Sequence, residues 1–209
     1  MTTIRRLADS CLVLRTDTAA TLIDPGFFTF DSGVVDLNTV GDISRVLITH
    51  EHGDHVKPEF VRWLIDRGTD VTVHGNLSVA DLLAPHDIEV LDYNPKDVTS
   101  EDVLHGKIPS GDQPPNRAYT VDGILTHPGD STEPTKAGPV MALGLLIPWA
   151  TPYEQIQFAK RVGVRQVIPT HDFYLTDGGR EFIEGFAGAA LAAEGIEMIS
   201  LLPGASYTV

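Results

Sequence analysis

The hydrophobic pattern at the start of the chain predicts three short strands. Apolar residues concentrate in segments 4–7, 11–14 and 20–23, and polar residues separate these segments. Short apolar segments bounded by polar turns are typical of antiparallel strands. The third segment runs into Asp24-Pro25-Gly26, where proline and glycine force a turn, so we expect the Asp24 carboxylate at the end of a strand.

From residue 46 the pattern changes to alternating strands and helices. Apolar positions at helical spacing alternate with short apolar runs, and Pro58 and Gly68 are suited to begin and end the first helix. This alternation is typical of α/β architecture. The expected elements are strand 46–48, helix 57–67, strand 71–73, helix 78–83 and strand 88–91.

The second half of the chain predicts a hairpin followed by a further series of strands and helices. The hairpin covers residues 118–125 around the turn Asp122-Gly123. Residues 93–115 show only a weak pattern and are expected to host a binding loop. The later elements are expected as strand 140–147, helix 152–162, strand 166–168, helix 180–193 and closing strands 197–202 and 207–209.

Residues of the kind that bind metals follow three of these predicted strands. Imidazole and carboxylate groups bind zinc and related metals, and the end of a buried strand supports them rigidly. The first group, at residues 50–55, holds more ligands than one catalytic ion with an open position can use, so two ions are expected. The three groups are His50-Glu51-His52-Gly53-Asp54-His55, His127-Pro128-Gly129-Asp130-Ser131 and Pro169-Thr170-His171-Asp172.

Composition favours a single domain over residues 1–209. The chain is 42% hydrophobic and 21% charged, and no segment rich in Gly, Ser and Pro separates two halves. Its net charge of −14 repels polyanions, and its 15 Lys and Arg are scattered as singles and short pairs. A small-molecule substrate is therefore expected, and a nucleic-acid partner is not.

The sequence also predicts a cytoplasmic protein without a membrane partner. No secretion signal is visible at the N-terminus. The longest apolar run lies between Pro139 and Pro148, well below the length that spans a membrane. The single cysteine, Cys11, excludes an internal disulfide and suits a reducing compartment.

With the motif His-x-His-x-Asp-His complete at residues 50–55, the sequence resembles the metallo-beta-lactamase superfamily. The other segments occur in the matching order: residues 22–26 precede the motif, Gly129-Asp130 follows it, and His171 lies late in the chain. Within the superfamily the chain looks most like the cytoplasmic hydrolases that include the phosphorylated-ascorbate lactonases. The closer resemblance is carried by residues 127–131, Ile147-Pro148-Trp149 and residues 168–172.

The resemblance implies an α/β fold of the four-layer αββα type, a sandwich of two mixed sheets packed face to face and flanked by helices. It also implies two divalent metal ions, zinc in the first place and manganese as the alternative. Asp24 is expected to steady the histidine loop without binding metal. The implied ligands are His50, His52 and a further histidine for the first ion, Asp54, His55 and His171 for the second, and Asp130 as the bridge.

The further histidine has four candidates along the chain, His74, His86, His105 and His127. His105 is favoured because it lies in an expected loop before the hairpin that delivers Asp130. His127 is the main alternative. Because it lies three residues before Asp130, it would otherwise orient a ligand or meet the substrate.

The implied chemistry is hydrolysis by a hydroxide that bridges the two ions and attacks an electrophilic carbon or phosphorus. Asp54 is the expected catalytic residue, because it is placed to accept or relay a proton. The expected substrate is a small ester, lactone or phosphoester, and loop shapes that one sequence does not fix choose among them. The alternative is a metal-binding regulatory or ligand-binding protein on the same fold, without turnover.

Overall fold

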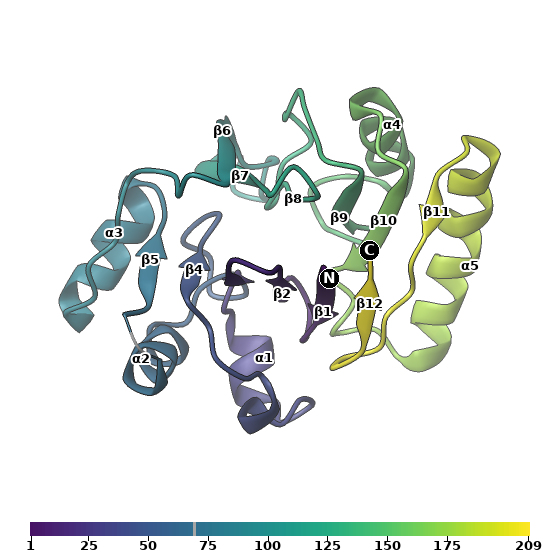
Figure 1. Ribbon diagram of the computed structural model, residues 1–209. Coiled ribbons are helices and arrows are strands. Elements are labelled where there is room, and N and C mark those ends of the chain that lie inside the picture. The colour runs from purple at the N-terminus through teal and green to yellow at the C-terminus, as the bar shows by residue number, and fades with distance from the viewer. Residues whose placement is uncertain (69) are drawn as a thin grey trace. The chain divides into compact units, whose positions relative to one another are not determined.

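The computed structural model describes residues 1–68 and 70–209, which form two compact units (Figure 1). Unit 1 comprises Met1–Pro95 and Leu201–Val209, and unit 2 comprises Lys96–Ser200. Each unit contains one mixed six-stranded sheet with helices of its own. The predicted α/β class with two mixed sheets flanked by helices is therefore confirmed. The single domain expected from composition stays a prediction.

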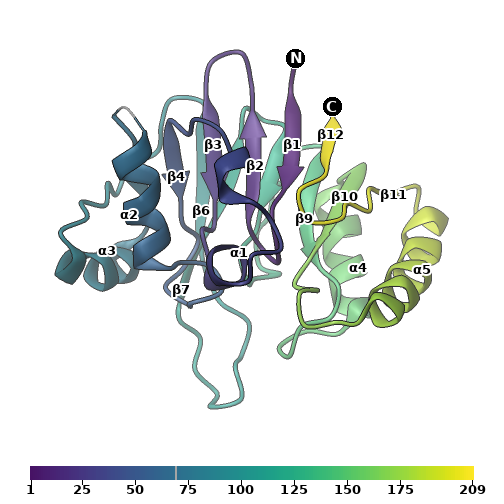
Figure 2. The same ribbon diagram turned by 90° about the horizontal axis from the view of Figure 1, so that it is seen from below.

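The sheet of unit 1 changes from antiparallel to parallel pairing at its third strand in sequence. Strands β1 to β3 pair antiparallel, and β3, β4 and β5 pair parallel; Figure 2 shows β1 to β4 side by side. The carboxyl ends of β3 and β4 therefore lie at the same edge of the sheet. The strands, in sheet order, are β12 (Ser206–Thr208), β1 (Thr3–Arg6), β2 (Leu12–Arg15), β3 (Ala20–Ile23), β4 (Arg45–Leu47) and β5 (Thr72–His74).

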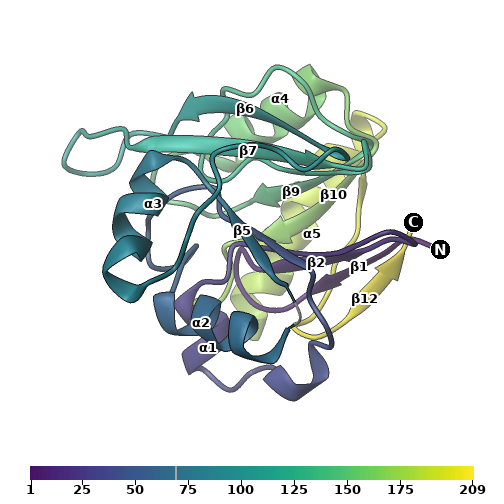
Figure 3. The same ribbon diagram turned by 60° about the vertical axis from the view of Figure 1, so that its left-hand side comes forward.

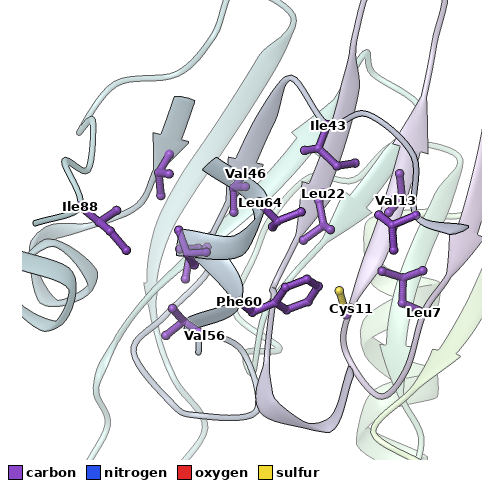
Figure 4. Close-up of a cluster of buried hydrophobic side chains, with 14 of the residues drawn as sticks. Leu7, Cys11, Val13, Leu22, Ile43, Val46, Val56, Phe60, Leu64 and Ile88 are labelled. Carbon is purple, nitrogen blue, oxygen red and sulfur yellow. The ribbon is translucent and has the colours of Figure 1, made fainter. Parts of the chain in front are cut away.

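The core of unit 1 lies between its sheet and α2 (Pro58–Arg67). Phe60 and Leu64 of α2 belong to the same buried cluster as Leu22 and Val46 of the sheet (Figure 4). Cys11 is part of this cluster, and burial raises the pKa of its thiol, so the sulfur packs as an uncharged core atom. The other helical elements of this unit are α1 (Phe27–Asp31), η1 (Leu37–Thr39), α3 (Leu77–Leu83) and η2 (Ala84–His86).

The sheet of unit 2 has the same change of pairing. Strands β6 to β8 pair antiparallel, and β8 to β11 pair parallel. The carboxyl ends of β8 and β10 therefore lie at one edge, where the segments carrying Asp130 and His171 begin. The strands are β6 (Val98–Leu104), β7 (Pro115–Val121), β8 (Leu125–His127), β9 (Val140–Gly144), β10 (Gln166–Thr170) and β11 (Glu197–Met198).

Two helices cover the parallel part of this second sheet. Figure 1 shows α4 (Pro152–Val162) and α5 (Asp177–Ala193) beside β9, β10 and β11. Thr151 caps α4 through a reciprocal pair of hydrogen bonds with Glu154, and Gly163 ends the helix at a φ of 73°. The prediction of helix 152–162 is confirmed to the residue, because proline and glycine mark both ends.

Two sequence predictions are wrong. Residues 88–91 form no strand but contribute one bridge, between Leu91 and His74. Residues 98–104, expected to lie in an irregular binding loop, form β6 and pair with β7 over its full length. The irregular part is shorter, residues 105–114, and extends away from β6 and β7 (Figure 3). None of the described helices is both long and apolar enough to cross a membrane.

Gly185 lies inside α5, where an added Cβ would meet no atom within 4 Å. Gly185→Ala is expected to raise the free energy of unfolding by about 0.5–1 kcal/mol, because alanine is the better helix former. Urea unfolding measures the change. Gly188→Ala, in the same helix, is the control: its Cβ would lie 2.9 Å from the Met198 Cε, so a smaller gain is expected. Equal gains at the two positions would contradict this packing.

Candidate metal-binding site

The histidine loop of unit 1 is fastened to the sheet by Asp24. This buried residue follows β3 with a φ of 55°, a conformation that is uncommon outside glycine. Its carboxylate accepts hydrogen bonds from the Thr49 backbone N–H at 2.8 Å and from the Thr49 hydroxyl at 2.8 Å. It also contacts His55 Nδ1 at 2.7 Å. Asp24 is thus joined to the histidine loop at Thr49 and at His55.

These contacts also set the tautomers of two histidines. A carboxylate can only accept, so His55 donates from Nδ1, which leaves the Nε2 lone pair available for a metal. The Thr49 hydroxyl donates to Asp24, so at 3.1 Å it accepts the Nδ1 hydrogen of His50. His50 Nε2 is then the unprotonated nitrogen of its ring, and it lies 3.1 Å from His52 Nδ1.

The atoms of unit 1 that are candidates for binding metal form two pairs. His50 Nε2 lies 3.1 Å from His52 Nδ1, and His55 Nε2 lies 3.7 Å from Asp54 Oδ2. Two ligands of one tetrahedral zinc ion, each about 2.0–2.1 Å from the metal, are about 3.3 Å apart. Both separations are close to that value, so each pair fits a shared ion.

In unit 2 the Asp130 carboxylate contacts two histidines, one through each oxygen. Asp130 Oδ1 lies 2.9 Å from His171 Nε2, and Asp130 Oδ2 lies 3.2 Å from His105 Nε2. The His105 Nδ1 lies 2.5 Å from the carbonyl oxygen of Gly106, which can only accept, so Nδ1 carries the hydrogen. In the neutral ring the Nε2 lone pair then faces a carboxylate oxygen, an arrangement that a cation held between the two atoms would stabilise.

The backbone around these unit 2 ligands is unusual. His171 directly follows β10 with a φ of 58°, and Gly129, before Asp130, has a φ of 60°. Non-glycine residues in this region cluster at functional sites. Asn116 secures the turn, since its amide donates to the Pro128 carbonyl at 2.8 Å and its side-chain oxygen accepts from the Asp130 N–H at 3.1 Å.

The other histidines have different surroundings. His127 is buried, and its Nδ1 accepts from the Gly129 N–H at 3.2 Å. His74 contacts the Tyr93 carbonyl oxygen at 2.9 Å and the Thr72 hydroxyl at 3.0 Å, so both of its ring nitrogens are engaged within unit 1. Burial lowers the pKa of His74, which keeps this ring neutral. His86 is exposed in η2.

Sequence reasoning did not predict the contacts of two residues that hold Asp130 in place. Asn116 is one, and Trp149 is the other: its indole Nε1–H donates to Asp130 Oδ2 at 3.1 Å. The Trp149 ring also meets the His105 ring edge to face, with centroids 5.5 Å apart. Trp149 carried part of the family resemblance as the end of an apolar run, but nothing in that run signals a contact with Asp130.

Three solved structures have a similar fold over almost the whole chain. A protein named as a metal-dependent hydrolase, from Parabacteroides distasonis, aligns with a TM-score of 0.73 at 22% identity, over 95% of this chain and 92% of its own. Igni18, a metallo hydrolase from Ignicoccus hospitalis, aligns with a TM-score of 0.73 at 14% identity, over 100% and 99%. YhfI, a metallo-beta-lactamase fold protein from Bacillus subtilis, aligns with a TM-score of 0.63 at 12% identity, over 99% and 99%.

The family model of the metallo-beta-lactamase superfamily matches residues 4–57, which include Asp24 and the whole motif from His50 to His55. The chain has the metallo-beta-lactamase fold. The match and the solved structures also support its placement in the metallo-beta-lactamase superfamily, as the motif predicts. A search of curated proteins finds no match. The candidate ligands thus lie on a fold whose solved members include proteins named as metal-dependent hydrolases.

Proposed function

We propose that this protein is a hydrolase that binds two divalent metal ions and cleaves a small ester, lactone or phosphoester. The Asp130 carboxylate carries the proposal, because each of its oxygens faces a different imidazole, at 2.9 Å and 3.2 Å. A carboxylate so placed is suited to bridge two ions. Unit 1 supplies one further pair of candidate ligands for each ion, His50 with His52 and Asp54 with His55.

The ligand assignment follows the pairs within each unit. His105 is supported over His127 as the third histidine of the first ion, because the His105 ring is the one that contacts Asp130. The mixture of imidazole and carboxylate ligands favours zinc, with manganese as the alternative. In full, His50, His52 and His105 would hold the first ion, Asp54, His55 and His171 would hold the second, and Asp130 would serve both.

When bound, two such ions lower the pKa of a shared water molecule and polarise the oxygen of the bond under attack. The protein's own groups complete the reaction. The Asp54 side chain is 30% exposed, so its carboxylate is placed to accept the proton of the attacking water and to release it to solvent. Asp24 keeps the hydrogen of His55 on Nδ1, which holds Nε2 ready as a ligand.

The substrate is proposed to be a small molecule handled in the cytoplasm. The net charge of −14 disfavours nucleic acids as substrates, although bound cations would still attract a small anion locally. The closer resemblance to phosphorylated-ascorbate lactonases makes a phosphorylated lactone the first natural type of substrate to test.

The test compares metal-loaded variants on generic substrates. Apoprotein is loaded with Zn²⁺ or Mn²⁺ and assayed on p-nitrophenyl acetate, a γ-lactone and bis(p-nitrophenyl) phosphate. Wild type is expected to hydrolyse at least one of them, and His52→Ala and Asp54→Ala are expected to lose that activity. His86→Ala replaces an exposed histidine of the same unit and is expected to match wild type.

Metal analysis of the same samples is expected to find two ions per wild-type chain and fewer in the His52 and Asp54 variants. If wild type binds metal but hydrolyses no substrate of the panel faster than His52→Ala does, the result would favour the regulatory alternative. Wild type that binds no divalent ion would contradict both.

A further inference from the structure

Trp149 contacts two of the candidate metal ligands of unit 2 at once. Its indole Nε1–H donates to Asp130 Oδ2 at 3.1 Å, and its ring lies edge to face against the His105 ring. It reaches them from the segment after β9, 19 residues along the chain from Asp130. Trp149 is not among the described residues that form the buried cluster under α4 and α5.

The indole hydrogen bond restricts how Asp130 can bind metal. A carboxylate oxygen has two lone pairs, and the indole N–H occupies one of those on Oδ2. His105 Nε2 lies 3.2 Å from the same oxygen. The indole hydrogen bond therefore helps to hold Oδ2 beside His105, while Oδ1 lies 2.9 Å from His171 Nε2.

Gly106 allows the indole to approach this closely. A Cβ on Gly106 would lie 2.2 Å from Trp149 Cε3, a separation that no side chain tolerates. The Gly106 N–H also donates to the Asp130 carbonyl oxygen at 2.7 Å. The loop after β6, the turn after β8 and the segment after β9 are thus joined around one carboxylate.

We propose that Trp149 is a positioning residue for the metal-bridging carboxylate. Its N–H fixes the orientation of Asp130, and its ring limits the rotation of His105, so that both are in place before an ion binds. Such support typically changes metal affinity by about 10- to 100-fold. The inference rests on the proposed function, because it takes Asp130 and His105 as metal ligands.

The first experiment measures Zn²⁺ affinity by competition with a chelating indicator. Trp149→Phe keeps an aromatic ring and removes the N–H, and it is expected to weaken Zn²⁺ binding by about 10- to 100-fold. Trp63→Phe is the matched control. Trp63, the only other tryptophan, packs on Phe60 and beneath Arg67 in unit 1, so its loss is expected to leave Zn²⁺ affinity unchanged.

The second experiment needs no change at Trp149. In Trp63→Phe all tryptophan fluorescence comes from Trp149, and its emission is expected to change with added Zn²⁺ over the range in which the ion binds. This readout stays informative if Trp149→Phe folds poorly, which urea unfolding without metal detects.

The outcomes separate the two proposals. Wild type that binds no Zn²⁺ would contradict the proposed function. If wild type does bind Zn²⁺, either of two results would contradict the role proposed for Trp149. The first is that Trp149→Phe folds and binds Zn²⁺ as tightly as Trp63→Phe does. The second is that the fluorescence emission of Trp149 stays constant up to saturating Zn²⁺.

Discussion

Replacing Asp130 by asparagine is expected to lower turnover by about a thousandfold. The carboxylate faces His171 through one oxygen and His105 through the other, so the substitution weakens both proposed ions together. Activation by bound metal contributes several kcal/mol to catalysis, and about 4 kcal/mol corresponds to a thousandfold in rate. Steady-state hydrolysis of the best substrate from the panel, with metal content measured in parallel, checks the prediction.

Asp122→Asn is the matched control for this substitution. It removes the same charge from the same unit, and Asp122 lies in the β7–β8 turn with a φ of 52°, which asparagine adopts readily. Its turnover and metal content are expected to equal those of wild type. If Asp130→Asn retained both ions and more than a tenth of the activity, Asp130 would not be the bridge.

Replacing Gly26 by alanine is expected to destabilise the protein by about 3 kcal/mol or more. A Cβ at this position would lie 1.8 Å from the backbone oxygen of Asp54. Gly26 has a φ of −82°, which any residue adopts, so the whole effect comes from this collision. The loop that carries Asp54 must move to relieve it. Urea unfolding measures the loss of stability, and Zn²⁺ affinity is expected to fall with it.

Gly53→Ala tests whether any close contact of an added Cβ in this loop would cause such a loss of stability. Its Cβ would meet Cδ1 of Phe27 at 3.3 Å, where the edge of a side chain can move by a few tenths of an ångström. The expected loss is about 1 kcal/mol or less. Similar losses for the two variants would mean that the loop adapts easily and that Gly26 is not needed for its path.

The elements that could be predicted from the sequence are those with local signals. Pro152 and Gly163 mark both ends of α4, and Asp122-Gly123 marks the hairpin turn. The two errors concern segments whose state is set by distant partners. Ile88 is apolar because it joins the core of unit 1, not because it pairs in a sheet, whereas β6 is stabilised by its pairing with β7.

The candidate site divides in the same way. The motif from His50 to His55 is contiguous, so its candidate ligands can be recognised directly. Spacing alone did not decide between His105 and His127, because the position of a ring relative to Asp130 depends on how the loop after β6 folds. The contact of Trp149 with Asp130 could not be predicted either, because a single hydrogen bond between residues 19 positions apart produces no periodic pattern in the sequence.

The change from antiparallel to parallel pairing gives the two sheets the same strand topology. Strands β1 to β5 and strands β6 to β10 each run as two antiparallel pairs followed by two parallel pairs. Asp24 follows the third strand of the first series, and Asp130 follows the third strand of the second. Each series therefore has an aspartate shortly after its third strand, one residue beyond β3 and three residues beyond β8, and the first supports the histidine loop whereas the second is a proposed metal ligand.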